Sequence, residues 1–291
     1  MNGKVIVVGG PTASGKSDLA VRLAKKYGGE VISADALLVY KGLNIGTAKP
    51  TKEEMQDIPH HLIDVVEPTQ NFSVSDYERL ALPILEDILS RGKTAIICGG
   101  TGFYIKALLF KSQFGNTPQN QEIREKYKKI AQEKGNTYLH NLLKACDKES
   151  AEKLHENDTK RVIRALEIFE LTGKKKSEQQ DKEIARYPYT AYAVDFPREA
   201  LYERINRRVD LMFELGLLDE VKGLISLGID ENCQCMQAIG YKEVYEGLQT
   251  GASVAQMKEL IQKNTRNYAK RQITFFKKFP LIEWIDKDTL L

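Results

Sequence analysis

The sequence predicts an α/β fold, in which helices flank a parallel sheet and an all-helical insertion interrupts the core. A β-branched run at residues 4–8 leads directly into a glycine-rich loop. Two later apolar runs, at 30–33 and 94–98, are each followed by polar or glycine-rich residues. This is typical of strands in open α/β sheets, where ligands bind at the carboxyl ends of the strands. A long polar stretch with helical periodicity then precedes a further strand pattern.

The first strand and helix of the core lie within residues 4–29. The continuous run from Lys4 to Val8 is typical of a strand buried on both faces of a parallel sheet. Apolar residues from Leu19 to Tyr27 recur at helical spacing, and the Gly28-Gly29 pair can end that helix. Because the carboxyl ends of parallel strands meet at one edge, we expect the loops after all three strands to face one crevice.

The insertion divides the core into two segments. We predict a core domain of residues 1–115 and 190–291, and a helical insertion domain of residues 116–189. Within the insertion, Arg161 to Phe169 reads as a helix. Asn157 or Asp158 can cap its start, and Gly173 can close its end.

The core resumes with one strand and one long helix. Residues Ala191 to Phe196 return to a strand pattern. From Leu201 to Leu227 apolar residues recur at steps of three and four, which predicts a single amphipathic helix.

The composition is that of a soluble globular protein. Apolar residues make up 42% and charged residues 29% of the chain. No run approaches the roughly 18 apolar residues that a membrane helix needs, and the four cysteines fit a reducing compartment. We expect a cytoplasmic monomer that makes no contact with a membrane.

The net charge of +3 neither indicates nor excludes nucleic-acid binding, but the distribution of charge along the sequence is informative. Residues 261–280 carry six Lys/Arg and no Asp/Glu, interleaved with aromatic residues that include Tyr268, Phe275, Phe276 and Phe279. Such a stretch can follow phosphates and stack on bases. A helix with a solvated basic face is the alternative.

The glycine-rich loop fits the P-loop pattern G-x-x-x-x-G-K-[ST] and lies between a predicted strand and helix. Its glycines permit backbone angles that point N–H groups at a phosphate, and the helix adds its positive end. Lys16 supplies a point charge, and the Ser17 hydroxyl can coordinate Mg²⁺. We therefore expect a P-loop NTPase-like core. The expected phosphate- or nucleotide-binding residues are Gly10, Pro11, Thr12, Ala13, Ser14, Gly15, Lys16 and Ser17.

The ligand of this loop is not decided by the loop itself. Most such loops bind ATP or GTP, but a kinase should also carry an acidic residue at the end of a later strand. Here the third strand runs into Cys98-Gly99-Gly100-Thr101, and the acid, Asp35, follows the second strand instead. That arrangement favours a carboxylate that acts on an acceptor.

Several segments together resemble the tRNA dimethylallyltransferases, also called tRNA isopentenyltransferases or IPP transferases. They occur in a consistent order over nearly the whole chain. The segments are GPTASGKS (10–17), ISADALLVYKGLNIGTAKP (32–50), HHLID (60–64), GGTGFYIKALL (99–109), HENDTKRVIRALE (155–167), LYERINRRVDLM (201–212), MQAIGYKE (236–243) and NTRNYAKRQITFF (264–276). Eukaryotic members often carry an additional C-terminal zinc finger, which this sequence lacks, so we expect a bacterial-type enzyme.

The resemblance implies an Mg²⁺-dependent transferase that moves a prenyl group from dimethylallyl diphosphate to N6 of adenosine 37, beside the tRNA anticodon. A P-loop with Mg²⁺ suits this reaction, because the diphosphate leaving group gains charge as its bond breaks. A carboxylate can accept the proton of the attacking amine. Asp35 matches the family's catalytic aspartate, Thr101 its channel threonine and Arg208 its diphosphate-binding arginine, with Lys16 as a further catalytic group.

Each of these residues also has an ordinary structural alternative. Asp35 could cap a helix or belong to the Mg²⁺ shell, Thr101 could be a turn residue, and Arg208 could be an exposed helix arginine. We expect that last role for Arg204 and Arg207.

The resemblance also implies contacts with the anticodon stem-loop. The residues concerned are Asp35, Ala36, Leu37, Leu38, Thr101, Arg124, Lys160, Arg161, Arg164, Gln237, Gly240, Lys242, Arg266, Arg271 and Gln272. Arg161 and Arg164 stand three apart, so we expect them to share a helix face. Most members have serine where Ala36 stands, and many have glutamine where Leu38 stands, so this enzyme's reading of the bases beside the target should differ.

Three other functions compete with this interpretation. A P-loop kinase of a small metabolite would release ADP and ignore tRNA. A prenyltransferase acting on free adenine nucleotides would not need the arginine-bearing insertion. An RNA-binding module without catalysis does not account for the P-loop together with Asp35.

Overall fold

The computed structural model describes residues 4–111, 117, 119–178 and 184–286. The chain folds as two compact units, residues 1–109 with 185–291 and residues 110–184, and each is described by itself. The boundary predicted after residue 115 lies outside the described residues.

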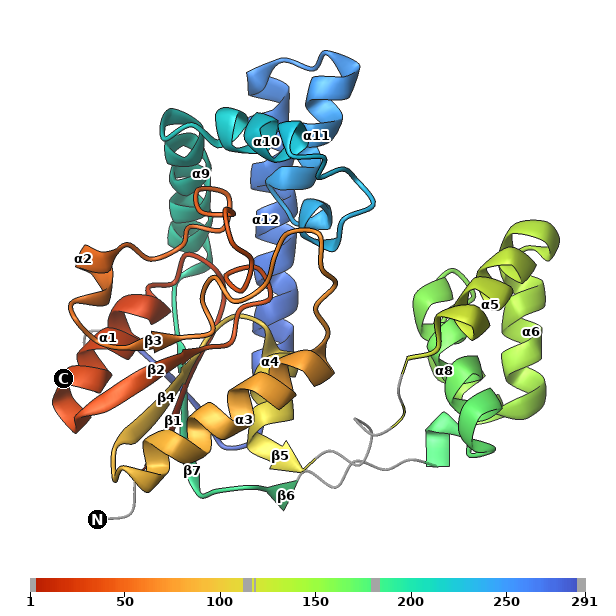
Figure 1. Cartoon of the computed structure of the whole chain (residues 1–291), viewed down its shortest axis with the longest axis horizontal. Helices are drawn as coiled ribbons and strands as arrows, with labels where there is room; N and C mark the ends of the chain where they lie inside the picture. Colours follow the sequence, from red (N-terminus) through yellow and green to blue (C-terminus); the bar gives the residue numbers. More distant parts are fainter. Residues whose placement is uncertain (1–3, 112–116, 118, 179–183, 287–291) are drawn as a thin grey trace. The chain divides into compact units, whose positions relative to one another are not determined.

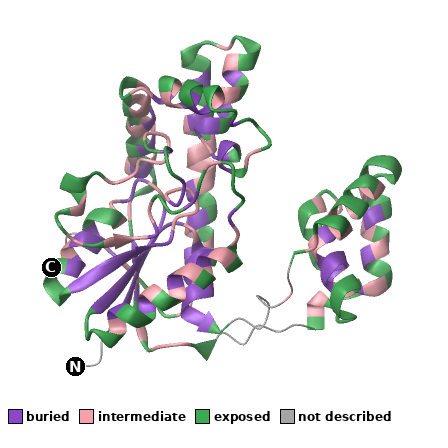
Figure 2. Cartoon of the chain, in the orientation of Figure 1, coloured by how far each residue is buried: buried purple, intermediate pink, exposed green. Residues whose placement is uncertain are grey.

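The core unit is built on a six-stranded sheet in the order β3-β2-β4-β1-β7-β8, and all its paired strands are parallel. The predicted α/β class with a parallel sheet is confirmed. The central strands are buried along their length, as Figure 2 shows. The strands are β1 (Val5–Gly9), β2 (Gly29–Ser33), β3 (His60–His61), β4 (Thr94–Cys98), β7 (Tyr189–Val194) and β8 (Ile282–Ile285).

Helices surround this sheet (Figure 1). Those of the core unit are α1 (Lys16–Tyr27), α2 (Lys52–Met55), α3 (Val74–Ser90), α4 (Gly102–Leu109), α9 (Arg198–Glu214), α10 (Leu217–Ser226), α11 (Tyr241–Thr250) and α12 (Val254–Phe276), with a 3₁₀ turn η2 (Gln234–Gln237). Helix α1 packs Leu19 and Leu23 against Ile6 and Val8 of β1, and it ends at Gly28 in the left-handed conformation, as predicted.

The prediction of one helix over residues 201–227 is wrong. The structure has two helices, α9 and α10, separated at Leu215 and Gly216. Gly216 has φ 101°, which lies in the left-handed region and cannot continue an α-helix. Each helix buries apolar residues at helical spacing, Leu201, Ile205 and Val209 on α9 and Leu217, Val221 and Leu224 on α10, so periodicity alone did not reveal the turn.

The second unit is helical and has its own core. It contains α5 (Gln121–Lys134), α6 (Asn136–Cys146), α7 (Lys148–Lys153), α8 (Thr159–Thr172) and a 3₁₀ turn η1 (Lys176–Glu178). Leu139, Leu143, Val162 and Leu166 are buried together between these helices. Helix α8 contains the predicted 161–169 helix and ends at the left-handed Gly173. Two short strands, β5 (Phe110–Lys111) and β6 (Ile184–Ala185), pair where the chain enters and leaves this unit.

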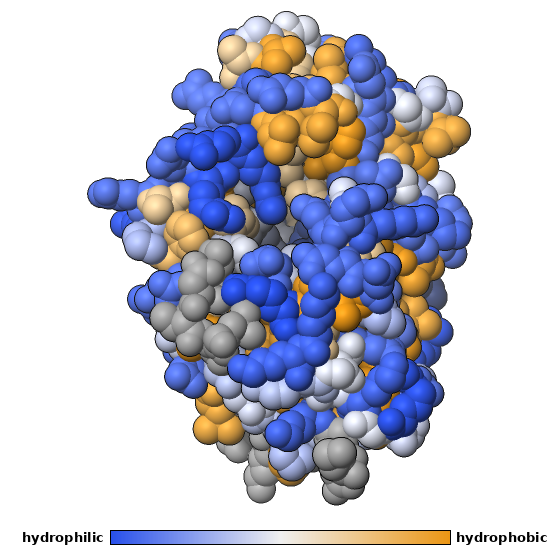
Figure 3. Space-filling model, turned by 90° about the vertical axis from the view of Figure 1, so that its left-hand side faces the viewer, coloured by the Kyte–Doolittle hydropathy of each residue, from blue (hydrophilic) through white to orange (hydrophobic). Residues whose placement is uncertain are grey.

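The surface is largely polar. On the face drawn in Figure 3, hydrophilic side chains predominate and hydrophobic ones form separate patches. None of the helices in the described ranges combines the length and the apolar character needed to cross a bilayer.

Candidate active site

The loops after β1, β2 and β4 meet at one edge of the sheet, as predicted. The Gly99 N–H donates to the Val8 carbonyl at 3.1 Å, and the Thr101 N–H donates to the Ala34 carbonyl at 3.1 Å. A Cβ atom on Gly99 would lie 2.1 Å from the Ala34 oxygen, so only glycine permits this approach. These contacts place Thr101 beside the segment that begins at Asp35.

The P-loop connects β1 to α1 in a strained backbone path. Gly10, Ala13 and Gly15 all have positive φ angles, of 128°, 63° and 90°. Ser14 is fully buried, and its hydroxyl finds no hydrogen-bond partner among the described residues. A buried polar atom without a partner is costly, so the loop is arranged for a ligand that brings acceptors or donors.

Lys16 lies at the centre of this loop. Its Nζ donates to the Pro11 carbonyl at 3.3 Å. Burial lowers the pKa of the Lys16 amine, and the charge of Arg208 adds to the lowering, whereas the charge of Asp35 raises it. The charged form of Lys16 has therefore lost part of its hydration, and an anion bound in the loop would stabilise it.

Two arginines of α9 reach the P-loop. Arg208 donates to the Thr12 hydroxyl at 3.4 Å, and Arg204 donates through Nε to the Ala13 carbonyl at 2.9 Å. Burial first, and then the charge of Arg204, lowers the pKa of Arg208. Arg204 is an exposed helix arginine, as predicted, but its bond to Ala13 gives it a place beside the P-loop that was not expected. Its four-residue spacing from Arg208 puts both on one helix face, a signal that was available in the sequence.

Asp35 is held at the carboxyl end of β2. Its Oδ1 accepts the Leu37 N–H at 2.9 Å, and the next N–H, that of Ala36, donates to the Thr101 hydroxyl at 3.1 Å. Asp35 is half-buried, and its charge acts on both Lys16 and Arg208. The predicted catalytic residues and the predicted diphosphate arginine are thus brought together.

Gln272 lies in a different place from the one its predicted tRNA contact requires. It is buried at 5% exposure, its Oε1 accepts the Thr12 N–H at 2.8 Å, and its Nε2 donates to the Gly100 carbonyl at 3.0 Å. The two loops thus take up one acceptor position and one N–H of this buried amide. Helix α12 instead carries it into the catalytic site.

Tyr268 is a site residue that the sequence did not single out. Burial, and then the charge of Asp35, raises the pKa of Tyr268 to about 12, while hydrogen bonds from Thr101 and Gln272 act in the opposite direction. Arg271 lies over its ring at 5.6 Å. Tyr268 was expected only as one of several aromatic residues in a basic stretch.

Two of the aromatic residues near the end of α12 are not free to stack on bases. Phe276 and Phe279 are buried, so the stacking interpretation of residues 261–280 is wrong for these two. Phe275 is half-buried and packs against the exposed Phe103, and for Phe275 stacking stays a prediction.

Of the other predicted tRNA-contacting residues of the core unit, Leu38 lies half-buried in the segment after β2, and the rest lie on α11 and α12 or just before them. Lys242 and Arg271 are exposed, whereas Arg266 donates to the Asn206 side chain at 2.6 Å. Gly240 caps α11 with φ 98°, and the exposed Gln237 donates to the Glu231 carbonyl.

In the helical unit, the predicted arginines are not equivalent. Arg124 and Arg164 both bond the fully buried carboxylate of Glu167, at 3.0 and 2.6 Å. Burial would raise the pKa of Glu167, but these two arginines hold it below its ordinary value. Lys160 and Arg161 are exposed, and Arg161 pairs with Asp158. Arg161 and Arg164 thus lie three residues apart on α8, but only Arg161 is exposed.

Metal binding at this site would depend on the substrate. The described residues include no cluster of three or more His, Cys, Asp or Glu that could hold an ion. Ser17 is exposed at the start of α1 and offers one oxygen ligand. This fits Mg²⁺, which in phosphate sites takes most of its ligands from phosphate oxygens and water.

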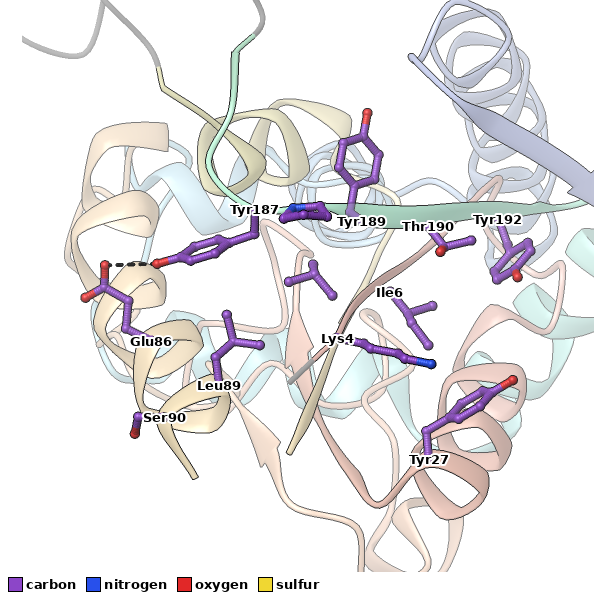
Figure 4. Close-up of a pocket in the computed structure, with 12 residues that line it drawn as sticks. Lys4, Ile6, Tyr27, Glu86, Leu89, Ser90, Tyr187, Tyr189, Thr190 and Tyr192 are labelled. Atoms are coloured by element: carbon purple, nitrogen blue, oxygen red, sulfur yellow. Dashed lines mark hydrogen bonds between the residues drawn. The ribbon is translucent and has the colours of Figure 1, made fainter. Parts of the chain in front are cut away.

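A separate cavity lies at the opposite edge of the sheet. Its volume is about 740 Å³, and it is lined by Lys4, Tyr27, Tyr187 and Tyr189 at the amino ends of β1 and β7 (Figure 4). Tyr187 donates to Glu86 across part of it at 3.4 Å. None of the predicted site residues lines it.

Comparisons with known proteins agree with one another. The family model described as IPP transferase matches residues 38–279. The chain is 46% identical over 287 residues to a tRNA dimethylallyltransferase of Acetivibrio thermocellus, covering 98% of this chain and 92% of that one. It is 48% identical over 290 residues to one of a Thermoanaerobacter species, with the same coverage.

Solved structures give the same result. The full-length tRNA isopentenylpyrophosphate transferase of Bacillus halodurans is similar with a TM-score of 0.73 and 41% identity, over 98% of this chain and 90% of that one. A eukaryotic dimethylallyltransferase acting on tRNA has a TM-score of 0.83 and 33% identity, over 98% and 74%. The match in sequence and fold extends over nearly the whole chain, and the chain therefore belongs to the IPP transferase family.

Proposed function

We propose that this protein transfers the dimethylallyl group of dimethylallyl diphosphate to N6 of adenosine 37 in the tRNA anticodon loop, and releases diphosphate. The observation that carries the proposal is the convergence of a cationic phosphate loop with one carboxylate, Asp35, at the same edge of the sheet. Relatives that share nearly the full length of the chain are named for this activity.

The P-loop side of the site suits the leaving group. Lys16, Arg204 and Arg208 converge on the loop, and positive charge there stabilises the diphosphate as its bond to carbon breaks. The arginine fork can meet phosphate oxygens two at a time. Ser17 would hold Mg²⁺, which when bound adds positive charge to the same oxygens.

The Asp35 side suits the acceptor. The lone pair of the adenine amine is delocalised into the ring, so attack requires a nearby group that accepts a proton as the new C–N bond forms. The Leu37 N–H orients one oxygen of Asp35, and Thr101 holds the neighbouring Ala36 N–H. The base has to leave the loop stack to reach this carboxylate.

The grip on tRNA comes from exposed basic residues. Lys160 and Arg161 of the helical unit, and Lys242 and Arg271 of the core unit, are placed to follow phosphates. The proposal also retains the other predicted contacts except Gln272: Asp35, Ala36, Leu37, Leu38 and Thr101 near the target base, with Arg124, Arg164, Gln237, Gly240 and Arg266 further away. For Arg124 and Arg164, a contact with RNA would come in addition to their bonds with Glu167.

The test is a label-transfer experiment. The purified protein is incubated with Mg²⁺, unmodified tRNA, and either dimethylallyl diphosphate labelled in the prenyl group or ATP labelled in the γ-phosphate. We expect prenyl label in tRNA, mapped by nuclease digestion to adenosine 37, and no transfer of γ-phosphate. Phosphate transfer from ATP, or prenylation of free adenine nucleotides at the rate seen with tRNA, would refute the proposal.

A further inference from the structure

Helix α12 lies unusually close to the loops that end β1 and β4. Three glycines of those loops have no room for a side chain, because residues of α12 occupy the space. A Cβ atom would lie 2.5 Å from Phe276 at Gly9, 2.1 Å from the Gln272 Nε2 at Gly100, and 1.9 Å from Phe275 at Gly102. Helix and loops are therefore fitted to one another at van der Waals contact.

Gln272 joins these two loops by hydrogen bonds of opposite direction. Its Oε1 accepts the Thr12 N–H from the P-loop, and its Nε2 donates to the Gly100 carbonyl from the loop after β4. Only a side chain with both an acceptor and a donor at its end can make this pair of bonds. Gln272 is buried, so water does not readily replace either bond.

The two loops serve the two halves of the reaction. Thr12 belongs to the phosphate loop and bonds Arg208, whereas Gly100 precedes Thr101, whose hydroxyl holds Ala36 next to Asp35. The Gln272 side chain thus connects the loop proposed to bind the leaving group with the loop beside Asp35, where the amine is proposed to attack.

A second residue of α12 reinforces this link. Tyr268 stands one helical turn before Gln272, on the same face, and faces Thr101 and Asp35. Arg271 covers its ring from outside.

We propose that Gln272 is a positioning residue for the transfer step, and that it sets the separation of the diphosphate subsite from Asp35 and Thr101. This inference rests on the proposed function. Displacement requires the leaving oxygen, the prenyl carbon and the amine nitrogen in line, and a shift of about 1 Å in such an arrangement can cost about 10²-fold in rate. Each subsite keeps its own ligand contacts without Gln272.

The experiment separates the rate constant of the transfer step from the fraction of enzyme that is folded. Single-turnover transfer is followed with tRNA and dimethylallyl diphosphate both saturating, for wild type and Gln272→Leu. We expect the rate constant to fall about 10- to 100-fold, while KM for each substrate changes less than about threefold. A purely structural role would instead lower the reaction amplitude, through loss of folded enzyme, and leave the rate constant unchanged.

Two further variants sharpen the test. Gln272→Glu keeps an acceptor for Thr12 but turns a second oxygen toward the Gly100 carbonyl, so we expect its rate constant to fall as well. Gln249→Leu, at an exposed glutamine of α11, is the matched control and should transfer at the wild-type rate.

The outcomes separate this inference from the proposed function. Absence of transfer by the wild-type protein would refute the function itself. An active wild type, with a Gln272→Leu or Gln272→Glu rate constant within twofold of it, would overturn the positioning role alone.

Discussion

The environment of Asp35 is formed by residues from several parts of the chain. The strand ends just before it, the Leu37 N–H orients its carboxylate, and Lys16 and Arg208 lie within electrostatic reach. A carboxylate at this position can accept the proton of an attacking amine.

At this scale we predict that Asp35→Ala lowers kcat by about 10²–10⁴-fold, the usual contribution of a general base. The Kd for tRNA should change only a few-fold, because most of the binding energy comes from phosphate contacts elsewhere. Steady-state transfer and filter binding give the two values. Asp57→Asn, at an exposed aspartate, is the control. A variant that retains more than about a tenth of the wild-type kcat would not fit a general base.

Among the secondary-structure elements, the loop over residues 44–46 depends on a helix far away in sequence. The carboxylate of Glu220, on α10, accepts the N–H groups of Asn44, Ile45 and Gly46 at 2.8 to 3.1 Å, and the Tyr241 hydroxyl at 2.6 Å. Burial, and then the charge of Glu220, raises the pKa of Tyr241, so its hydroxyl stays protonated and donates. One carboxylate therefore fixes three successive peptide groups.

Glu220→Gln should loosen this loop, because the single oxygen of an amide cannot accept from all three N–H groups, and the charge that strengthens these hydrogen bonds is lost. We expect a loss of about 2 kcal/mol in the free energy of unfolding and faster hydrogen exchange at residues 44–46. Urea titration and exchange mass spectrometry measure these quantities. Asp219→Asn changes the neighbouring exposed carboxylate and should have neither effect. Wild-type protection of the loop in Glu220→Gln would contradict the assignment.

In the helical unit, the carboxylate of the buried Asp147 joins two elements. It accepts the N–H and hydroxyl of Ser150, at 3.0 and 2.6 Å, and the Ser177 N–H at 3.0 Å. Burial works to raise the pKa of Asp147, but these hydrogen bonds outweigh it and lower the pKa to about 2. The ionised carboxylate of Asp147 thus connects the start of α7 to η1 by hydrogen bonds.

This depressed pKa predicts a pH-dependent stability. The contribution of Asp147 is fully present above its unfolded pKa, near 4, and is lost as pH falls toward 2; it amounts to about 2 kcal/mol. Asp147→Asn should therefore be less stable than wild type by about that amount at pH 6 and nearly equal to it near pH 2. Urea titrations across this range measure the difference. Glu152→Gln, at an exposed carboxylate, should show no such convergence.

On the scale of the whole molecule, the residues assigned to the chemistry lie in one unit. Every residue placed around the P-loop and Asp35 belongs to the core unit. In the helical unit, Lys160 and Arg161 are exposed, and the proposed function assigns them to RNA binding, whereas Arg124 and Arg164 pair with Glu167.

Lys160→Ala combined with Arg161→Ala should raise KM for tRNA and flatten the salt dependence of binding by about one unit, because phosphate contacts release counterions. KM for dimethylallyl diphosphate should stay the same. Arg164→Ala should behave differently and destabilise the helical unit, since it leaves the buried Glu167 with one partner fewer. Binding titrations at several salt concentrations and thermal unfolding distinguish the two results. If the double variant binds with the wild-type salt slope, the grip lies elsewhere.

The sequence by itself determined the α/β class, the P-loop, and the family to which the chain belongs. These follow from local patterns: a buried β-branched strand is continuous, and a phosphate loop needs its glycines, lysine and serine in fixed order. Lys16, Asp35, Thr101 and Arg208 could be named for the same reason, because each lies within a short motif.

Only the tertiary structure decided which polar residues face inward. Gln272, Tyr268 and Glu220 lie far along the chain from the loops that they contact, and helical periodicity does not say which loop a helix face will meet. The bond between Arg164, a predicted RNA contact, and the buried Glu167 was likewise not predicted from the sequence. A partner close in space but distant in sequence leaves no local signal, so these roles appear only once the chain is folded.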